Sequence, residues 1–530
     1  MRMNGLVYGK PVRNTKICTV GIRTMIRRCM RFRKVFKKFF QRRKQMHMKS
    51  RIFSVILAAI LLSSCGASET VQETEKEVST ETMETVPETE ASPNLEAVDY
   101  GGYSFWMIES DLLAGGVLHY EVFAQEETGE VINDAVFQRN LTLNDKYNIS
   151  IESSYFGYAD YNSFVSSIKA GEDLYDVTCA IIGNTFSYAL NGYYRETQEF
   201  PHLDFTADWW LPGVMEQTSI LNQNYFGICK GNITTFNSMP VLFFNKQMSE
   251  SFAMDPPYAL VEEGKWTFDA LYDYCKNISQ DLDGDGKYTE TDMFGLAVNS
   301  FAAVTFSMGS GFSFLDKDDD DIPHFQYDEQ FITYFQKIVE KLTNDNTILY
   351  GEKCKDRVQS IKQAFMEDRA FFYNEMLAYS SHLREMETDF GIVPMPKWDA
   401  SQESYCTFAH TGYATTMAIP ITNTTDDDRV GRILEDYAYY SMKYVYPAYL
   451  ETTVKGKQSR DEDSKRMVDI IIRNVKYDWI MMSAVTDTLR QLFTAGSTDV
   501  VSKFAANQSK YEKTLEGYVK SVQKIMEKED

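Results

Sequence analysis

The sequence predicts an α/β fold in which helices cover parallel sheets, with enough folded chain for two lobes. Between residues 103 and 182, short apolar runs alternate with helical segments in the order β-α-β-α-β, which is typical of a parallel sheet with helices on its faces. Near Tyr100 a polar, acidic stretch gives way to aromatic-rich sequence. About 430 residues then follow without a second linker, which is enough for two separate cores.

The first sheet is predicted from three strands and two helices. The strands are Tyr103–Ile108, Ile149–Ser153 and Asp176–Ile182, and the helices are Val131–Tyr147 and Asn162–Gly171, which a glycine ends. In open parallel sheets, ligands bind beyond the carboxyl ends of the strands. The residues after Ile108, Ser153 and Ile182 are therefore the first candidates for a ligand-facing rim.

Later segments continue the pattern. Thr267 is expected to cap a helix that begins at Phe268, with Asp269 favourably placed in its first turn. The other expected elements are a helix over Phe331–Leu342, strands over Ala370–Tyr373 and Gly391–Pro394, and helices over Val430–Tyr446 and Lys510–Lys528.

The N-terminal region predicts export. An 11-residue apolar run, Ile52–Leu62, follows Lys49 and Arg51, and this is the layout of a secretory signal that is too short for a spanning helix of about 20 residues. Cys65 directly after Leu-Ser-Ser resembles the lipobox of bacterial lipoproteins, which implies an acylated Cys65. The alternative is a buried cysteine after an ordinary signal. Residues 1–47 are interpreted as an upstream extension before a start at Met48, the alternative being a basic arm that binds a membrane or nucleic acid.

The chain after the signal is strongly acidic. Residues 1–64 hold 17 Lys or Arg and no Asp or Glu, so the remainder has 37 basic and 76 acidic residues and a net charge of about −39. This charge excludes nucleic acid as a natural partner and disfavours contact with an anionic bilayer. Residues 67–97 are rich in Glu and Thr and predict a disordered spacer.

The sequence carries no enzyme signature. Five cysteines besides Cys65 are widely spaced without a C-x-x-C pair, so neither a zinc site nor a disulfide framework is indicated. H-E-x-x-H, P-loop, G-x-G-x-x-G and G-x-S-x-G patterns are absent. We therefore expect a protein that is not an enzyme.

The clearest local motif is a calcium-type loop, Asp281–Asp292. Its carboxylates stand at loop positions 1, 3, 5 and 12, with Gly286 at position 6, and the expected ligands are Asp281, Asp283, Asp285, the Lys287 carbonyl and Asp292. Position 12 is Asp where such loops have Glu, so its reach is shorter. The alternative is a metal-free Asp-Gly turn.

Six stretches in order resemble an extracellular solute-binding protein (family 1-like) of a carbohydrate-type ABC importer: Asp99–Phe105, Asn133–Asn140, Asp173–Val177, Val241–Lys246, Lys265–Asp269 and Asp389–Lys397. The resemblance implies a type II periplasmic-binding-protein fold, with two lobes, a hinge and an interlobe cleft. The expected N-terminal lobe is 99–235 with 395–450, and the C-terminal lobe is 236–394 with 451–530. The basic extension and the weak motif content beyond about Lys476 depart from the pattern.

Function follows from the same resemblance. It implies a monomeric receptor, anchored by lipid at the extracellular face of the cytoplasmic membrane, that captures an oligosaccharide and delivers it to ABC permease subunits. A sugar site needs flat rings beside polar groups. The alternatives are a cell-surface glycoside hydrolase, which needs two carboxylates across a cleft, and the same fold binding a peptide or another small polar solute.

Candidate ligand-binding residues stand after strands or in loops. Glu109 follows the first strand, Asn184 follows the third, and Trp209 and Trp210 follow a polar turn. His410 and Tyr413 lie in a glycine-containing loop, and Tyr373, Asn374 and Glu375 fall, by resemblance, where such proteins contact ligand. For any single aromatic residue the alternative is core packing.

Overall fold

The computed structural model describes residues 91–110, 121–156, 161–198, 200–211, 213–454, 462–478 and 484–529. They belong to one compact unit, Glu90–Asp530. The predicted signal, the lipidation site Cys65 and most of the spacer lie outside the described residues. In the part of the chain that is described, no helix has the length and hydropathy needed to cross a membrane.

The first lobe is built on a parallel sheet in the order β2-β1-β3. Its strands are β1 (Tyr103–Ser110), β2 (Ile149–Phe156) and β3 (Val177–Cys179), and the connecting helices are α2 (Val131–Tyr147) and α3 (Asn162–Ala170). The chain leaves α2 through Asn148, which is left-handed at φ 47°, and enters β2 at once. The predicted β-α-β-α-β order is confirmed.

Two later segments extend this sheet through isolated bridges. Thr178 of β3 pairs antiparallel with Ala418, and Met417 pairs antiparallel with Gly227. Returning chain near 415–420 therefore lies beside β3, and chain near 227 lies beside that segment. The order is β2, β1, β3, the returning segment and the segment near 227.

The second lobe is built on a five-stranded mixed sheet in the order β10-β4-β9-β5-β8. Its strands are β4 (Pro240–Asn245), β5 (Phe294–Val298), β8 (Ile348–Tyr350), β9 (Ala370–Met376) and β10 (Phe390–Val393). β8, β5 and β9 are parallel, whereas β4 is antiparallel to β9 and β10. The two lobes thus share a strand pattern. Each has three parallel strands, and beside them lies one antiparallel strand: the segment near 415–420 in the first lobe and β4 in the second. A fifth segment lies on the far side of that strand: the segment near 227 in the first lobe and β10 in the second.

Helices pack on both faces of the second sheet. They are α7 (Lys246–Ser251), α8 (Tyr258–Glu262), α9 (Phe268–Cys275), α10 (Ala302–Gly309), α11 (Glu329–Asn344), α12 (Arg357–Met366) and α13 (Ser380–Leu383), with 3-10 turns η2 (Gly351–Lys353) and η3 (Leu377–Tyr379). The Thr267 side chain accepts a hydrogen bond from the Ala270 amide at 3.2 Å, which confirms the predicted cap of α9.

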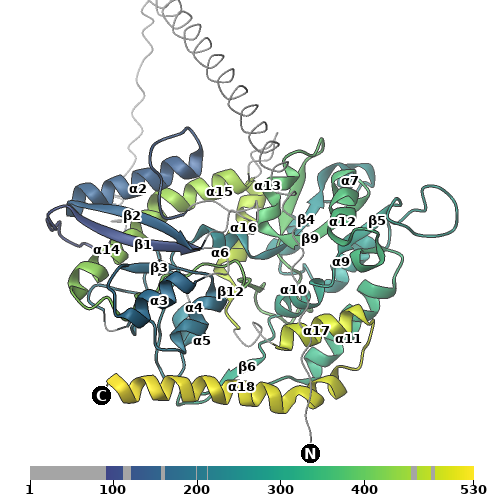
Figure 1. The fold of residues 1–530 in the computed structure, drawn as a ribbon. Coiled ribbons are helices and arrows are strands. Elements are labelled where there is room, and N and C mark those ends of the chain that lie inside the picture. Colours follow the sequence, from purple (N-terminus) through teal and green to yellow (C-terminus); the bar gives the residue numbers. More distant parts are fainter. Residues whose placement is uncertain are drawn as a thin grey trace, which may run out of the picture. The chain divides into compact units, whose positions relative to one another are not determined.

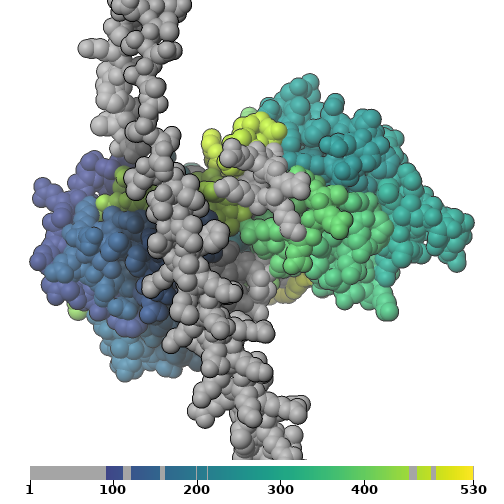
Figure 2. Space-filling model, turned by 90° about the horizontal axis from the view of Figure 1, so that it is seen from above, coloured from purple at the N-terminus to yellow at the C-terminus, as the bar shows by residue number. Residues whose placement is uncertain are grey.

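The chain passes between the lobes three times. It crosses through α6 (Ile233–Asn237) into β4, returns after β10 to the segment near 415, and crosses again after α14 (Asp427–Tyr440). α14 contacts α2 of the first lobe, and α16 (Glu462–Arg473) contacts β10 of the second. Between them lie the π-helical turn η4 (Ser441–Val445) and α15 (Tyr446–Val454). Figure 1 shows the two sheets on opposite sides of these crossings, and Figure 2 shows first-lobe residues in blue on the left and second-lobe residues in teal and green on the right.

The remaining elements are short or lie near the C-terminus. They are α4 (Ile182–Ala189), α5 (Val214–Thr218), the hairpin β6 (Leu315–Lys317) and β7 (Pro323–Phe325), the pair β11 (Thr407–Phe408) and β12 (Val475–Lys476), α17 (Ala484–Thr494) and α18 (Val500–Glu529).

Helix α18 contacts both lobes, as the yellow helix along the bottom of Figure 1 shows. Phe504 near its start stacks on Phe331 of α11 at 6.1 Å between ring centroids. Tyr518 further along meets Phe186 of α4, edge to face, at 5.2 Å. The sequence places 451–530 wholly in the C-terminal lobe. The contact of α18 with α4 of the first lobe was not predicted. The other lobe boundaries stay a prediction.

Candidate functional site

Polar side chains gather where the first sheet ends. The Ser110 hydroxyl at the end of β1 lies 2.6 Å from the Tyr161 hydroxyl, and Tyr161 in turn has a hydrogen bond with the Asn184 side chain at the start of α4. Glu109 precedes Ser110 and is 4% exposed. The predicted rim residues Glu109 and Asn184 therefore belong to one polar group at the carboxyl end of β1 and β3.

The returning crossing segment closes against this rim. The Ile182 amide donates to the Ala414 carbonyl at 2.8 Å, and the Gly183 amide donates to the Thr411 carbonyl at 3.1 Å. A Cβ added at Gly183 would lie only 3.3 Å from the Thr411 oxygen, so glycine permits this close approach. The first lobe and the loop with His410 and Tyr413 are thus in direct contact.

The second lobe contributes rings at the same place. The His410 ring lies 5.2 Å from the Phe301 ring, which follows β5, and 5.1 Å from the Tyr413 ring. A cavity of about 50 Å³ opens among these segments. Its lining joins Ile182 of the first lobe to residues of the second lobe and the crossings: Phe301, Val304, Phe408, Ala409, His410, Thr411, Lys476, Tyr477, Asp478 and Thr486. We call this space the cleft site.

His410 is neutral at physiological pH. Burial lowers its pKa to about 4, and Arg490 acts in the same direction. The Gly412 amide donates to Nδ1 at 3.0 Å, so the ring proton is on Nε2. His410 therefore offers a donor and a flat ring, both useful to a hydroxylated ligand.

Two buried carboxyl groups have raised pKa values. Burial raises the pKa of Glu109 to about 8, although the Ser153 hydroxyl, which donates to it at 2.5 Å, opposes the rise. Burial raises the pKa of Glu375 to about 7. Near neutral pH Glu109 is therefore largely protonated and Glu375 about half protonated, and in the protonated form each can donate as well as accept.

Tyr373 and Asn374 lie inside β9, which continues to Met376 beyond the predicted end of the strand at Tyr373. Tyr373 is fully buried, with its ring 6.2 Å from Phe243. The Asn374 amide donates to the Val241 carbonyl at 3.1 Å and accepts from Thr305 at 2.8 Å. Their expected position after a strand is wrong, because both belong to the centre of the sheet.

Trp209 and Trp210 are also core residues, 5% and 3% exposed. Both indole N–H groups donate to the Glu435 carboxylate, at 2.8 and 2.9 Å. Core packing, the alternative to ligand binding, therefore describes both rings, because one buried carboxylate of α14 accepts from both. Trp210 does line a second cavity.

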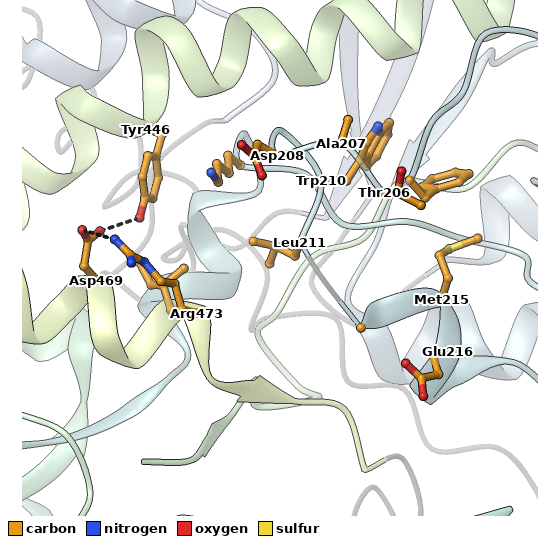
Figure 3. Close-up of a pocket in the computed structure, with 14 residues that line it drawn as sticks. Thr206, Ala207, Asp208, Trp210, Leu211, Met215, Glu216, Tyr446, Asp469 and Arg473 are labelled. Atoms are coloured by element: carbon orange, nitrogen blue, oxygen red, sulfur yellow. Dashed lines mark hydrogen bonds and ion pairs between the residues drawn. The ribbon is translucent and has the colours of Figure 1, made fainter. Parts of the chain in front are cut away.

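This second cavity holds about 850 Å³ and shares no residue with the cleft site. One wall is the first-lobe segment from Phe205 to Glu216 together with Lys230, and the other is Tyr446 with Asp469, Ile472 and Arg473 of α16. Figure 3 shows Tyr446, Asp469 and Arg473 grouped at one end and Met215 and Glu216 at the other. We call this space the α16 pocket.

The calcium-type loop brings three of its five expected ligands together. Carboxylate oxygens of Asp281, Asp283 and Asp285 lie within 4.8 Å of one another. Asp292 is fully buried and accepts from the Leu282 and Thr289 amides at 2.9 and 2.7 Å. Gly286 has the φ of +78° that the turn needs. This donor set of hard oxygens fits Ca²⁺.

Sequence reasoning missed Phe301 and Tyr379. Each follows a strand of the second sheet, β5 or β9, so the rule that selected Glu109 applies to them as well. Burial raises the pKa of Tyr379 to about 12, and the negative charge of Glu375 acts in the same direction. Lys230 and Tyr446 of the α16 pocket had no such signal, because 216 positions separate them in the chain.

Comparison with solved structures finds the same fold. UspC from M. tuberculosis matches at a TM-score of 0.50 and 13% identity, over 77% of this chain and 99% of that chain. MalE from Listeria monocytogenes in complex with maltose matches at 0.49 and 13%, over 79% and 98%. The substrate-binding protein Lmo0181 from Listeria monocytogenes in complex with cycloalternan matches at 0.47 and 10%, over 80% and 99%.

No protein-family model and no curated protein sequence matches the chain. The two lobes have sheets with the same strand pattern, and the chain has the fold of UspC. These observations confirm the predicted fold, which is two α/β lobes of the type II periplasmic-binding-protein class.

Proposed function

We propose that this chain is a solute-binding protein that captures an oligosaccharide between its lobes and delivers it to an ABC permease. One observation carries the proposal: the rim of the first sheet, the returning crossing and the end of β5 meet at the cleft site. The cavity holds only about 50 Å³, so the lobes must separate to admit an oligosaccharide. A ligand held there contacts both lobes, and it favours the ligand-bound closed form by its greater affinity for that form.

The side chains at the cleft site suit a sugar. Phe301 and His410 line the site and offer rings for the C–H faces of a pyranose. Tyr413 lies beside His410, and Asn184 offers an amide near Ile182 at the start of α4. Burial keeps Glu109, at the end of β1, largely uncharged near neutral pH, which favours hydroxyl partners over cations. In this proposal the protein binds and releases its ligand and cleaves no bond in it.

Isothermal titration of the purified chain against a panel of plant and host glycans tests this proposal. We expect at least one oligosaccharide to bind with a Kd of about 1 μM, and His410→Ala and Asn184→Ala to weaken it by about tenfold or more. His324→Ala, on the exposed β6–β7 hairpin, is the matched control and should leave the Kd unchanged. Absent heats across the panel, or release of reducing sugar at a catalytic rate, would contradict the assignment.

The sequence supports a lipid anchor on the same protein. In this proposal Cys65 is acylated and 65–98 is a spacer that keeps a monomeric receptor near its permease on the extracellular face. Metabolic labelling with palmitate should mark the wild type and the control Cys354→Ser, and should fail for Cys65→Ser. Labelling of Cys65→Ser at the wild-type level would overturn the anchor.

Calcium binding to the loop 281–292 is a further part of the proposal. Asp281, Asp283 and Asp285 would supply carboxylate ligands, the Lys287 carbonyl a fourth oxygen, and Asp292 a fifth if its backbone hydrogen bonds rearrange. The loop lies between α9 and β5, at the edge of the second lobe, so the metal would be structural.

A further inference from the structure

The α16 pocket is large and chemically divided. Its volume of about 850 Å³ falls in the range of small-molecule sites. Leu211, Met215 and Ile472 supply an apolar part. Tyr446, Asp469 and Arg473 form a polar group at one end, and Asp208 lies between that group and Met215 in the view of Figure 3.

Some charged side chains of the pocket form ion pairs with one another and others do not. The Asp469 carboxylate accepts from the Tyr446 hydroxyl at 3.2 Å and from Arg473 at 3.1 Å. Lys230 has no carboxylate within ion-pair distance among the described residues, and its Nζ meets the Met442 sulfur at 3.7 Å and the Tyr446 ring at 5.4 Å. Asp208 is exposed, and no hydrogen bond or ion pair of its carboxylate is found in the described part of the chain.

Lys230 is therefore a partly buried cation with its charge uncompensated at contact distance. Burial lowers the pKa of Lys230, whereas the charges of Asp208 and Asp469 raise it. An anionic ligand group at Nζ would replace lost hydration with a charge-assisted hydrogen bond. A cationic group on the same ligand would find Asp208 available.

We infer that the α16 pocket is a second binding site, distinct from the cleft site, for a short zwitterionic peptide. Its carboxylate binds Lys230, its ammonium group binds Asp208, and its apolar side chains contact Leu211, Met215 and Ile472. A neutral sugar fits less well here, because it carries no charged group to pair with Lys230 or Asp208. The two walls come from the first lobe and from α16, so an occupant contacts both.

The probe is the dipeptide Leu-Leu, titrated into the purified full chain. We expect saturable binding with a Kd of about 1 mM or tighter. N-acetyl-Leu-Leu lacks the ammonium group and Leu-Leu amide lacks the carboxylate, so each should bind about tenfold more weakly. Equal binding of the dipeptide and both derivatives would overturn the proposed contacts, and so would the absence of heat up to about 10 mM dipeptide.

Two charge-removing variants locate the site. Lys230→Met and Asp208→Asn should each weaken Leu-Leu by about tenfold, while their melting temperatures report that they are folded. Lys443→Met is the matched control: Lys443 is exposed, lies over the Tyr444 ring and does not line the pocket. Unchanged dipeptide affinity in folded Lys230→Met would overturn the assignment. It would mean that the peptide binds elsewhere, for example at the cleft site.

The same variants separate this inference from the proposed function. Glycan affinity should be unchanged within about twofold in Lys230→Met, because the two lining sets share no residue. Glycan binding without dipeptide binding would refute the second site alone. Dipeptide binding that depends on Lys230, without glycan binding, would refute the sugar assignment alone.

Discussion

Glu109 is a buried carboxyl group whose proton the folded state holds tightly. Since its pKa is about 8 in the folded protein and about 4.5 when unfolded, its contribution to stability is present below pH 4.5 and is lost as the pH rises toward 8. Glu109→Gln keeps an acceptor for Ser153 and cannot ionise. We expect it to be more stable than the wild type near pH 8, by about 1–3 kcal/mol.

Urea denaturation at pH 5 and pH 8 measures this difference. Glu152→Gln on the neighbouring strand β2 is the control, and it should follow the wild type at both pH values. A Glu109→Gln variant that loses as much stability as the wild type between these pH values would contradict the burial of an uncharged Glu109.

His410 gives the opposite pH dependence. Its pKa is about 4 when folded and about 6.5 when unfolded, so its contribution is present above pH 6.5 and is lost as the pH falls through 4. His410→Gln should flatten the decline of the melting temperature between pH 6.5 and 4. His324→Gln, whose ring is exposed beside Asp318, should not. Parallel curves for His410→Gln and the wild type would show that His410 is hydrated and readily protonated.

The residue scale also shows why part of the site escaped prediction. Glu109 and Asn184 could be found, because strand ends are local signals. Trp209 and Trp210 could not be placed, since their partner Glu435 is more than 220 residues away in the chain. Tyr373 reads as a strand end in sequence, yet neighbours β4 and β5 bury it from both sides.

At the scale of elements, α18 bridges the lobes through specific ring contacts. An edge-to-face aromatic pair contributes about 0.5–1.5 kcal/mol beyond its buried area. Double-mutant cycles on Phe186→Ala and Tyr518→Ala should therefore give a coupling energy of about 1 kcal/mol, measured by urea denaturation. The pair Phe186→Ala and Lys513→Ala, on the exposed face of α18, should give none. Zero coupling for the first pair would show that α18 does not bind the first lobe.

The loop 281–292 provides a second test at this scale. Ligand that binds only the folded state raises stability, so millimolar Ca²⁺ should raise the melting temperature of the wild type. Asp283→Asn removes a carboxylate that accepts only from the Asp285 amide, and should abolish this rise. Asp319→Asn, in the acidic run of the β6–β7 hairpin, is the control. Equal melting temperatures of the wild type with Ca²⁺ and with EDTA would contradict calcium binding and support the alternative, a metal-free Asp-Gly turn.

Elements with local causes were predicted well. α2 has its predicted bounds, and the Thr267 cap forms because its partner is three residues away. The antiparallel place of β4 and the pairing of the segment near 415 with β3 depend on chain crossings. The family resemblance implied the crossings through its lobe boundaries, and neither pairing was predicted. The reach of α18 across to α4 depends on tertiary contacts of Tyr518 and had no sequence signal.

For the whole molecule, the proposed function requires that the two lobes respond to a ligand at the cleft site. Three crossings connect them, and the crossing that carries His410 contacts the first lobe through Gly183. A ligand that binds the closed form more tightly than the open form shifts the population toward the smaller lobe separation, whereas an enzyme with a preformed site need not change it.

The most direct measurement is the distance between spin labels, one on each lobe, with and without glycan. Cysteines introduced at the exposed positions Asp145 on α2 and Glu340 on α11 would carry the labels. The account predicts that an oligosaccharide identified by calorimetry narrows the distance distribution and shifts it to a single population, and that His410→Ala prevents the shift at the same glycan concentration. Identical distributions with and without a glycan that binds would contradict capture between the lobes.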